Sequence, residues 1–189
     1  QRDKVLDGEN LKDSILSMVD ETIDSAIHGI LGEKPYIEAE DVAELRKRFV
    51  GLFLTPDDLK FSSEELDNLE PTQLRNMLCD KAHEVYEQKE EQNTPEIMRE
   101  LERVVLLRNV DEKWMDHIDA MTELRNGIGL RSFAQRDPVV EYKREGSEMY
   151  DAMIAAIRED TVRTMYLLRV QVKGQEPKRE RVAKESGAS

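Results

Sequence analysis

The sequence predicts an all-α protein, in which a small helical domain is followed by a long antiparallel hairpin of two helices. Two observations favour this fold class. Charged residues make up 37% of the 189 residues and aromatic residues only 5%, which is typical of helices with narrow apolar stripes. Apolar residues also recur at steps of three and four along most of the chain, which places them on one side of a helix.

The net charge of −13 is distributed unevenly along the chain. Residues 1–98 carry 11 Lys and Arg against 24 Asp and Glu, whereas residues 99–189 carry 17 of each. Nucleic-acid binding needs a positive field that displaces counterions from phosphates, so this balance argues against it. The stretch 125–144 is locally basic, with five basic residues against two acidic ones.

Residue content also disfavours several kinds of site. Cys79 is the only cysteine, so the chain can form no intrachain disulfide or thiolate metal site, and it fits a reducing compartment. No apolar run approaches the roughly 20 residues of a membrane-spanning helix, and we expect a soluble chain. None of the three histidines has a second ligand at metal-binding spacing, and no phosphate loop is present. We therefore expect no metal, no cofactor and no catalytic residue.

The first predicted helix spans residues 11–29 or 11–32, and a second spans about 40–53. The first carries one apolar stripe: Leu11, Ile15, Met18, Val19, Ile23, Ala26, Ile27 and Ile30. Thr55-Pro56 is expected to end the second helix, because a residue before proline avoids the helical backbone.

Two further helices complete the first half of the chain. Ser62 predicts the cap of a short helix that reaches Leu69, since a serine oxygen accepts a hydrogen bond from a first-turn amide. The next helix starts at Pro71 and has six inward apolar residues: Leu74, Met77, Leu78, Ala82, Val85 and Tyr86. Its end is expected to dissolve into the charged run 87–92. These helices should form a compact bundle.

Thr94-Pro95-Glu96 predicts the start of a long helix. The threonine is expected to cap it, the proline suits the first helical position, and the carboxylate suits the positive end of the helix dipole. No Pro or Gly interrupts residues 96–126, so the helix should be about 45 Å long. Its stripe is expected to face a partner helix: Ile97, Leu101, Val104, Leu107, Val110, Trp114, Ile118, Met121, Leu124 and Ile128, widened by Val105 and Leu106.

The partner helix is expected after Asp137-Pro138, because Gly127, Gly129 and that proline mark a reversal of the chain. Its apolar residues are Val139, Tyr142, Met149, Met153, Ile157, Met165 and Leu168, with Tyr150 and Ile154 alongside. Gly146 lies within the helix and costs about 1 kcal/mol relative to alanine. Residues 173–189 have almost nothing apolar to bury and are predicted to be a disordered tail.

Two aromatic residues have more than one interpretation. Trp114 lies on the apolar stripe, which favours packing against a helix over stacking on a ligand. Phe133 lies in the turn, outside either stripe and flanked by Arg131 and Gln135. Either Phe133 is presented to a partner or it folds back over the end of the hairpin, and the sequence leaves both open.

The segment from Trp114 to Lys143 resembles the two-helix finger in the C-terminal region of the SecA family, the motor ATPases of bacterial preprotein translocation. The matching residues are Trp114, His117, Met121, Leu124, Arg125, Gly127, Ile128, Leu130, Arg131, Phe133, Ala134, Gln135, Asp137, Pro138, Glu141, Tyr142 and Lys143. The resemblance implies four parts: the end of a scaffold helix (1–7), a helical wing domain (8–93), the finger of the helical scaffold (94–172) and a linker or tail (173–189).

The resemblance also implies roles for two groups of residues. In the family, the first finger helix packs against the motor domains and restrains ATP hydrolysis, which implies motor contacts for Trp114, His117, Met121 and Arg125. The finger tip enters the cytoplasmic mouth of the SecY channel and contacts unfolded preprotein, which implies tip contacts for Leu130, Arg131, Ser132, Phe133, Ala134 and Gln135. Phe133 stands where the family usually presents a tyrosine, so the aromatic face is kept and the hydroxyl is lost.

The partners implied are the remaining SecA domains, the SecY channel and unfolded preprotein, at the cytoplasmic face of the bacterial plasma membrane and in contact with it only peripherally. The family's motor domains, cross-linking domain and zinc-binding tail do not occur in the sequence, which implies a fragment without ATPase activity. The oligomeric state stays open. So do two other classes of protein: a free-standing helical adaptor that binds partner helices, and an enzyme with an unrecognised carboxylate site.

Overall fold

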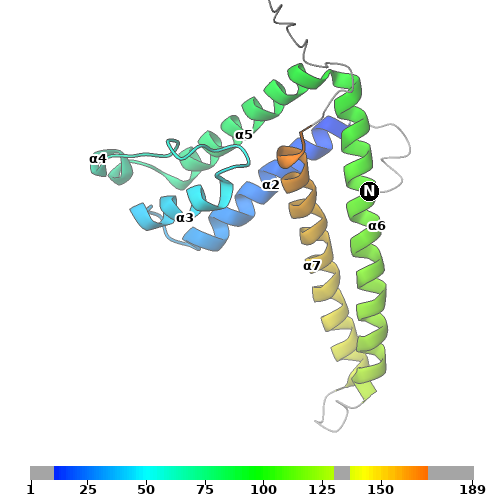
Figure 1. Cartoon of the computed structure of the whole chain (residues 1–189). Coiled ribbons are helices and arrows are strands. Elements are labelled where there is room, and N and C mark those ends of the chain that lie inside the picture. Colours follow the sequence, from blue (N-terminus) through cyan, green and yellow to red (C-terminus); the bar gives the residue numbers. More distant parts are fainter. Residues whose placement is uncertain (1–10, 130–136, 170–189) are drawn as a thin grey trace, which may run out of the picture.

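The computed structural model describes residues 11–129 and 137–169, and its regular structure there is helical (Figure 1). The all-α prediction is confirmed. Within those ranges, the one β-type pairing is an isolated bridge between Val50 and Leu54. The helices are α2 (Leu11–Leu31), α3 (Ala39–Phe49), α4 (Ser63–Asp67), α5 (Pro71–Asn93), α6 (Pro95–Ile128) and α7 (Pro138–Leu167). The predictions for residues 1–7 and 173–189 lie outside the described residues.

Helix α2 matches its prediction, whereas α3 ends four residues early. Gly32 follows the end of α2 with φ of 59°, a left-handed conformation that glycine adopts without strain. After α3, Gly51 turns the chain with φ of 86°, so the predicted helix end at Phe53 is wrong. Phe53 still reaches the core through this turn, where its ring stacks on Phe49 at 4.8 Å between centroids.

The cap of α4 is confirmed, and α5 is longer than predicted. Ser62 Oγ accepts a hydrogen bond from the Glu65 amide at 3.3 Å, and the Glu65 carboxylate accepts one from the Ser62 amide at 2.7 Å. The sequence predicted the end of α5 within residues 87–92, but the helix continues through them to Asn93. Glutamate, glutamine and lysine are good helix formers, so a charged run does not by itself stop a helix.

The two long helices begin where proline predicted them. Pro95 and Pro138 are their first residues, and the Asp137 carboxylate caps α7 by accepting a hydrogen bond from the Val139 amide at 2.9 Å. The predicted cap at Thr94 is wrong: its side chain makes no capping hydrogen bond, and its backbone has φ of 71°. A single residue therefore separates α5 from α6.

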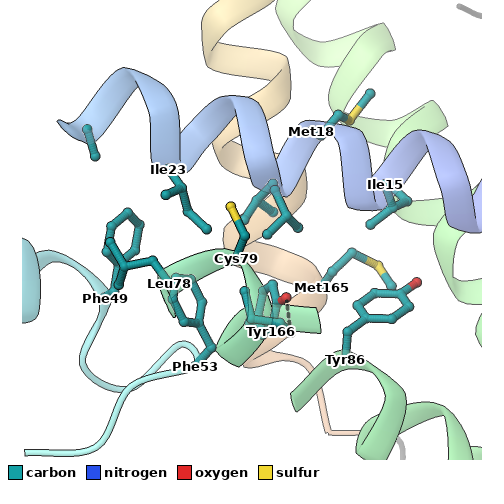
Figure 2. Packing of buried hydrophobic residues seen from close by; sticks show 14 of the residues in the cluster. Ile15, Met18, Ile23, Phe49, Phe53, Leu78, Cys79, Tyr86, Met165 and Tyr166 are labelled. Carbon is teal, nitrogen blue, oxygen red and sulfur yellow. Dashed lines mark hydrogen bonds between the residues drawn. The ribbon is translucent and has the colours of Figure 1, made fainter. Parts of the chain in front are cut away.

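Figure 2 shows part of the core, to which α2, α3, the turn after α3, α5 and the last turns of α7 contribute side chains. Helix α6 adds Met98, Val105 and Leu106 to the same core. The labelled residues are Ile15, Met18, Ile23, Phe49, Phe53, Leu78, Cys79, Tyr86, Met165 and Tyr166. The Tyr166 hydroxyl donates a hydrogen bond to the Ala82 carbonyl of α5 at 2.7 Å. The end of α7 is therefore built into the same core as α2, α3, α5 and the base of α6. The division into a wing (8–93) and a finger (94–172) stays a prediction.

Candidate functional site

The hairpin of α6 and α7 projects from the other helices (Figure 1). Its outer part has no fully buried side chain among the described residues. We call residues 107–129 and 137–152 the outer hairpin. Buried side chains of α6 end at Leu106 and those of α7 begin at Met153. The two helices of the outer hairpin therefore contact each other on one side and solvent on the others.

A seam of four contacts joins the two helices. From α6 it includes Asn109, Lys113, His117 and Met121, which meet Thr161, Asp160, Tyr150 and Gly146 of α7. The first contact is a hydrogen bond of 3.0 Å and the second an ion pair of 2.8 Å. The rings of the third are 6.0 Å apart between centroids, edge to face. The α6 residues are four positions apart and so share one side of the helix, which faces α7.

The predicted apolar stripe of α6 does not follow this seam, and the expectation that all of it faces a partner helix is wrong. Val104, Trp114 and Ile118 are exposed, although Met121 and Leu124 are partly buried. The stripe repeats at slightly less than the 3.6 residues of a helical turn, so it winds around α6 along its length. A nearly straight partner such as α7 covers only part of a stripe that winds in this way.

Three large apolar side chains lie uncovered on one patch of α6. Trp114, Met115 and Ile118 are 47%, 59% and 44% exposed, and we call them the outer apolar face. Met115 was missed from the sequence because it does not belong to the predicted stripe. Single exposed apolar residues are ordinary, whereas neighbouring ones mark contact sites. The signal available in the sequence was the adjacency of a methionine and a tryptophan, with Ile118 one turn later.

An aromatic row connects this face to α7. The Trp114 and His117 rings are 5.9 Å apart between centroids, and His117 in turn packs against Tyr150 across the seam. These contacts hold the tryptophan in place without burying it. The preference for Trp114 as a packing residue is thus only partly met: it packs on a neighbour but keeps about half of its surface exposed.

The four residues predicted to contact a motor share one side of α6. Trp114 and Arg125 are exposed, while His117 and Met121 are half-buried in the seam. Their spacing of three and four residues brings them together, as a helix requires. The predicted tip residues Leu130–Gln135 lie outside the described residues.

The described residues show little other chemistry. No group of three or more His, Cys, Asp or Glu side chains in residues 11–129 and 137–169 could hold a metal ion. In the same ranges no helix combines the length and apolar character needed to cross a membrane. Burial raises the pKa of the Cys79 thiol to about 12, so it is not a thiolate at neutral pH.

Comparison with known proteins supports the resemblance to the SecA family. Residues 1–170 match the model of the SecA wing and scaffold domain. Proteins named protein translocase subunit SecA match over 98–100% of this chain: 45% identical from Clostridium perfringens, 48% from Caldicellulosiruptor saccharolyticus and 40% from Acetivibrio thermocellus. The chain spans about a fifth of the length of these curated relatives. It therefore belongs to the SecA wing and scaffold family.

Proposed function

We propose that this chain is a non-catalytic part of a SecA protein-translocation motor, in which the hairpin acts as a stiff lever. Membership of the family and the names of its relatives support a role in protein transport. The observation that carries the mechanical role is the outer apolar face, which projects on a hairpin away from the chain's own core. Such a face is suited to binding another protein surface.

The surface that covers the outer apolar face is proposed to belong to the motor domains of the same SecA protein. Full burial of an apolar side chain of this size contributes about 1.5–3 kcal/mol, so three such side chains can hold a domain in place. Arg125 is exposed about two turns beyond Ile118 on the same helix, where it can pair with a carboxylate of the same partner. By holding the motor, this contact restrains ATP hydrolysis, as the resemblance implies for Trp114, His117, Met121 and Arg125.

The tip residues Leu130–Gln135 are proposed to contact the unfolded preprotein and the cytoplasmic mouth of the SecY channel. Apolar contact is non-directional, so an aromatic residue such as Phe133 can grip a chain without reading its sequence. This role places the protein at the cytoplasmic face of the bacterial plasma membrane. It needs no nucleotide site in this chain, and the chain alone is expected to hydrolyse no ATP. ATP turnover by the chain that a point substitution abolishes would contradict the proposal.

The motor contact is tested in the full-length SecA protein that contains this chain. Replacing Trp114, Met115 and Ile118 together by alanine is expected to raise basal ATP hydrolysis about fivefold, which corresponds to an activation free energy lower by about 1 kcal/mol. The control is Tyr36→Ala, which removes an aromatic side chain of similar exposure, 58%, in the loop before α3. Equal rates in the two variants would refute the contact.

The tip contact is tested by Phe133→Ala in the same protein. Preprotein translocation into channel-containing vesicles is expected to fall, while the helicity and melting temperature of the isolated chain stay unchanged. Val139→Ala, an exposed residue at the start of α7, is the control and should translocate normally. A photo-cross-linker at position 133 should yield adducts with channel or preprotein. A large loss of stability in Phe133→Ala would instead support a residue folded back over the hairpin.

A further inference from the structure

The bend between α5 and α6 is made by one residue in an unfavourable conformation. Thr94 has φ of 71° and ψ of 148°, which a β-branched residue rarely adopts. Such a backbone costs about 1–3 kcal/mol and persists only where surrounding contacts hold it. Asn93, the last residue of α5, is buried and donates a hydrogen bond to the Lys89 carbonyl at 2.7 Å, but it fixes only the α5 side.

Five side chains from three helices meet beside this bend, and we call them the elbow network: Lys12 of α2, Tyr86 and Glu90 of α5, and Arg99 and Glu102 of α6. The Glu90 carboxylate lies 2.5 Å from Lys12 Nζ and 2.6 Å from Arg99 Nη2. The same Arg99 nitrogen lies 2.8 Å from Glu102 Oε1, to which the Tyr86 hydroxyl donates a hydrogen bond. Each contact except the Arg99–Glu102 pair joins two different helices.

The network is partly buried and balanced in charge, with the Lys12 and Arg99 side chains 25% and 32% exposed. Glu102 is 0% exposed, Glu90 is largely buried, and two cations face two carboxylates. Burial raises the pKa of the Glu102 carboxyl. Within the described residues, Arg99 Nε and Glu102 Oε2 have no hydrogen-bond partner. Two buried polar atoms of the network therefore lack a hydrogen bond to any described residue.

An arrangement of this kind is a poor source of stability. Removing charges from water costs several kcal/mol per ion, and apolar residues of similar volume are often as stable or more stable. Ionic contacts nevertheless depend strongly on geometry, since each pair is favourable only at a short distance and the right angle. The network is thus better suited to selecting one angle between α5 and α6 than to holding the chain folded.

We propose that the elbow network is a lock that fixes the angle between α5 and α6, and that opening it lets the hairpin pivot at Thr94 while the helices on both sides stay folded. Apolar contacts also join the hairpin to the other helices: Met98, Val105 and Leu106 of α6 are buried in the core, and Tyr166 at the end of α7 meets Ala82 of α5. These contacts anchor the hairpin. The lock sets the direction in which the anchored hairpin points.

The test measures the distance between spin labels on the two helices of the bend. Labels are attached at Asp80→Cys in α5 and Glu112→Cys in α6, both exposed positions, in the full chain with Cys79→Ala. The parent should give one narrow distance distribution. The double variant Arg99→Met/Glu102→Met should broaden it about twofold, as expected when a second orientation becomes populated. Its helicity should be unchanged, and its free energy of unfolding unchanged or higher.

A second variant and two controls complete the design. Glu102→Gln keeps the shape of the side chain, removes its charge and should also broaden the distribution. Tyr166→Phe weakens the other link, and Glu100→Gln breaks an exposed pair with Arg103 on the same helix. Both controls should keep the parent distribution. The lock is refuted if both Glu102 variants keep the narrow parent distance, or if both lose their helicity, because the network is then part of the fold.

Discussion

The four-helix end of the molecule and its outer hairpin are built from the same kind of helix but held in different ways. In α2–α5 each long helix buries an apolar stripe in a shared core, whereas residues 107–129 and 137–152 bury no side chain completely. The hairpin helices instead meet through polar and aromatic contacts along one seam. We therefore expect the direction of the hairpin to be set at its base, where the core and the elbow network lie.

The largest expected difference concerns leucine residues at the two ends. Leu78→Ala removes a fully buried side chain of α5 and should lower the free energy of unfolding by about 2–5 kcal/mol. Leu124→Ala removes a partly exposed one in α6 and should lower it by about 1 kcal/mol. Urea unfolding followed by circular dichroism measures both. Equal losses would show that the outer hairpin contributes a core of its own.

A smaller difference is expected for two tyrosines of α7. Tyr166→Phe removes the hydroxyl that binds the Ala82 carbonyl inside the core, and should lower the free energy of unfolding by about 0.5–1.5 kcal/mol. Tyr150→Phe removes a hydroxyl from a half-exposed ring of the seam and should change it very little. Thermal and urea unfolding of both variants test this. A loss for Tyr150→Phe that matched Tyr166→Phe would contradict the comparison.

Two glycines report how closely neighbours approach. Alanine in place of Gly29, near the end of α2, would meet no atom within 4 Å and should stabilise by up to about 1 kcal/mol through helix propensity. At Gly146 the new methyl group would lie 3.1 Å from Met121 Cε, so the methionine must shift and the gain should be smaller. Melting temperatures rank the two. A larger rise in melting temperature for Gly146→Ala would mean that Met121 leaves more room at Gly146 than the 3.1 Å distance indicates.

The smallest effect is a pH dependence at the base of the hairpin. The Lys89 ammonium donates hydrogen bonds to the Met165 and Tyr166 carbonyls near the end of α7. Burial, followed by the charge of Arg169, lowers the pKa of Lys89 from 10.5 to about 8. Above pH 8 the unfolded chain then binds more protons than the folded one, so stability should rise with pH from 8 toward 10.5.

Measurement between pH 8 and 9 isolates this effect, because the raised pKa of Cys79 lowers stability only above about pH 9. Lys89→Met should abolish the rise in the free energy of unfolding. Lys81→Met, which removes a partly exposed lysine of the same helix, should keep it. The same slope in Lys89→Met as in the parent would assign the pH dependence to another group.

Local signals in the sequence predicted the elements well, because their physics is local. Pro95, Pro138 and Ser62 mark helix starts through a missing amide or a side-chain acceptor, and each is where the sequence placed it. The end of α3 was misjudged because Gly51 offered an earlier turn than Pro56. The cap at Thr94 was misjudged because contacts between helices, which the sequence does not display, determine its backbone.

The candidate site was only partly predictable for a related reason. A helical stripe shows which residues are apolar, but not which side the partner helix takes. Helix α7 covers His117 and Met121 of α6 and leaves Trp114 exposed. This arrangement depends on side chains of α7 such as Asp160 and Tyr150, which contact α6 along the seam. The elbow network was invisible in the sequence, since Lys12 and Glu90 are 78 positions apart.

The hydrogen bond between Tyr166 and Ala82, 84 positions apart, also determines when the protein can finish folding. All residues of α2–α5 have been synthesised once Asn93 is added, yet Met165 and Tyr166 still have to fill their core. During synthesis we expect this core to stay incomplete until the buried residues of α6 and α7 have been added. Contacts between such distant residues are slow to form. We therefore expect the last turns of α7 to join the core late in folding.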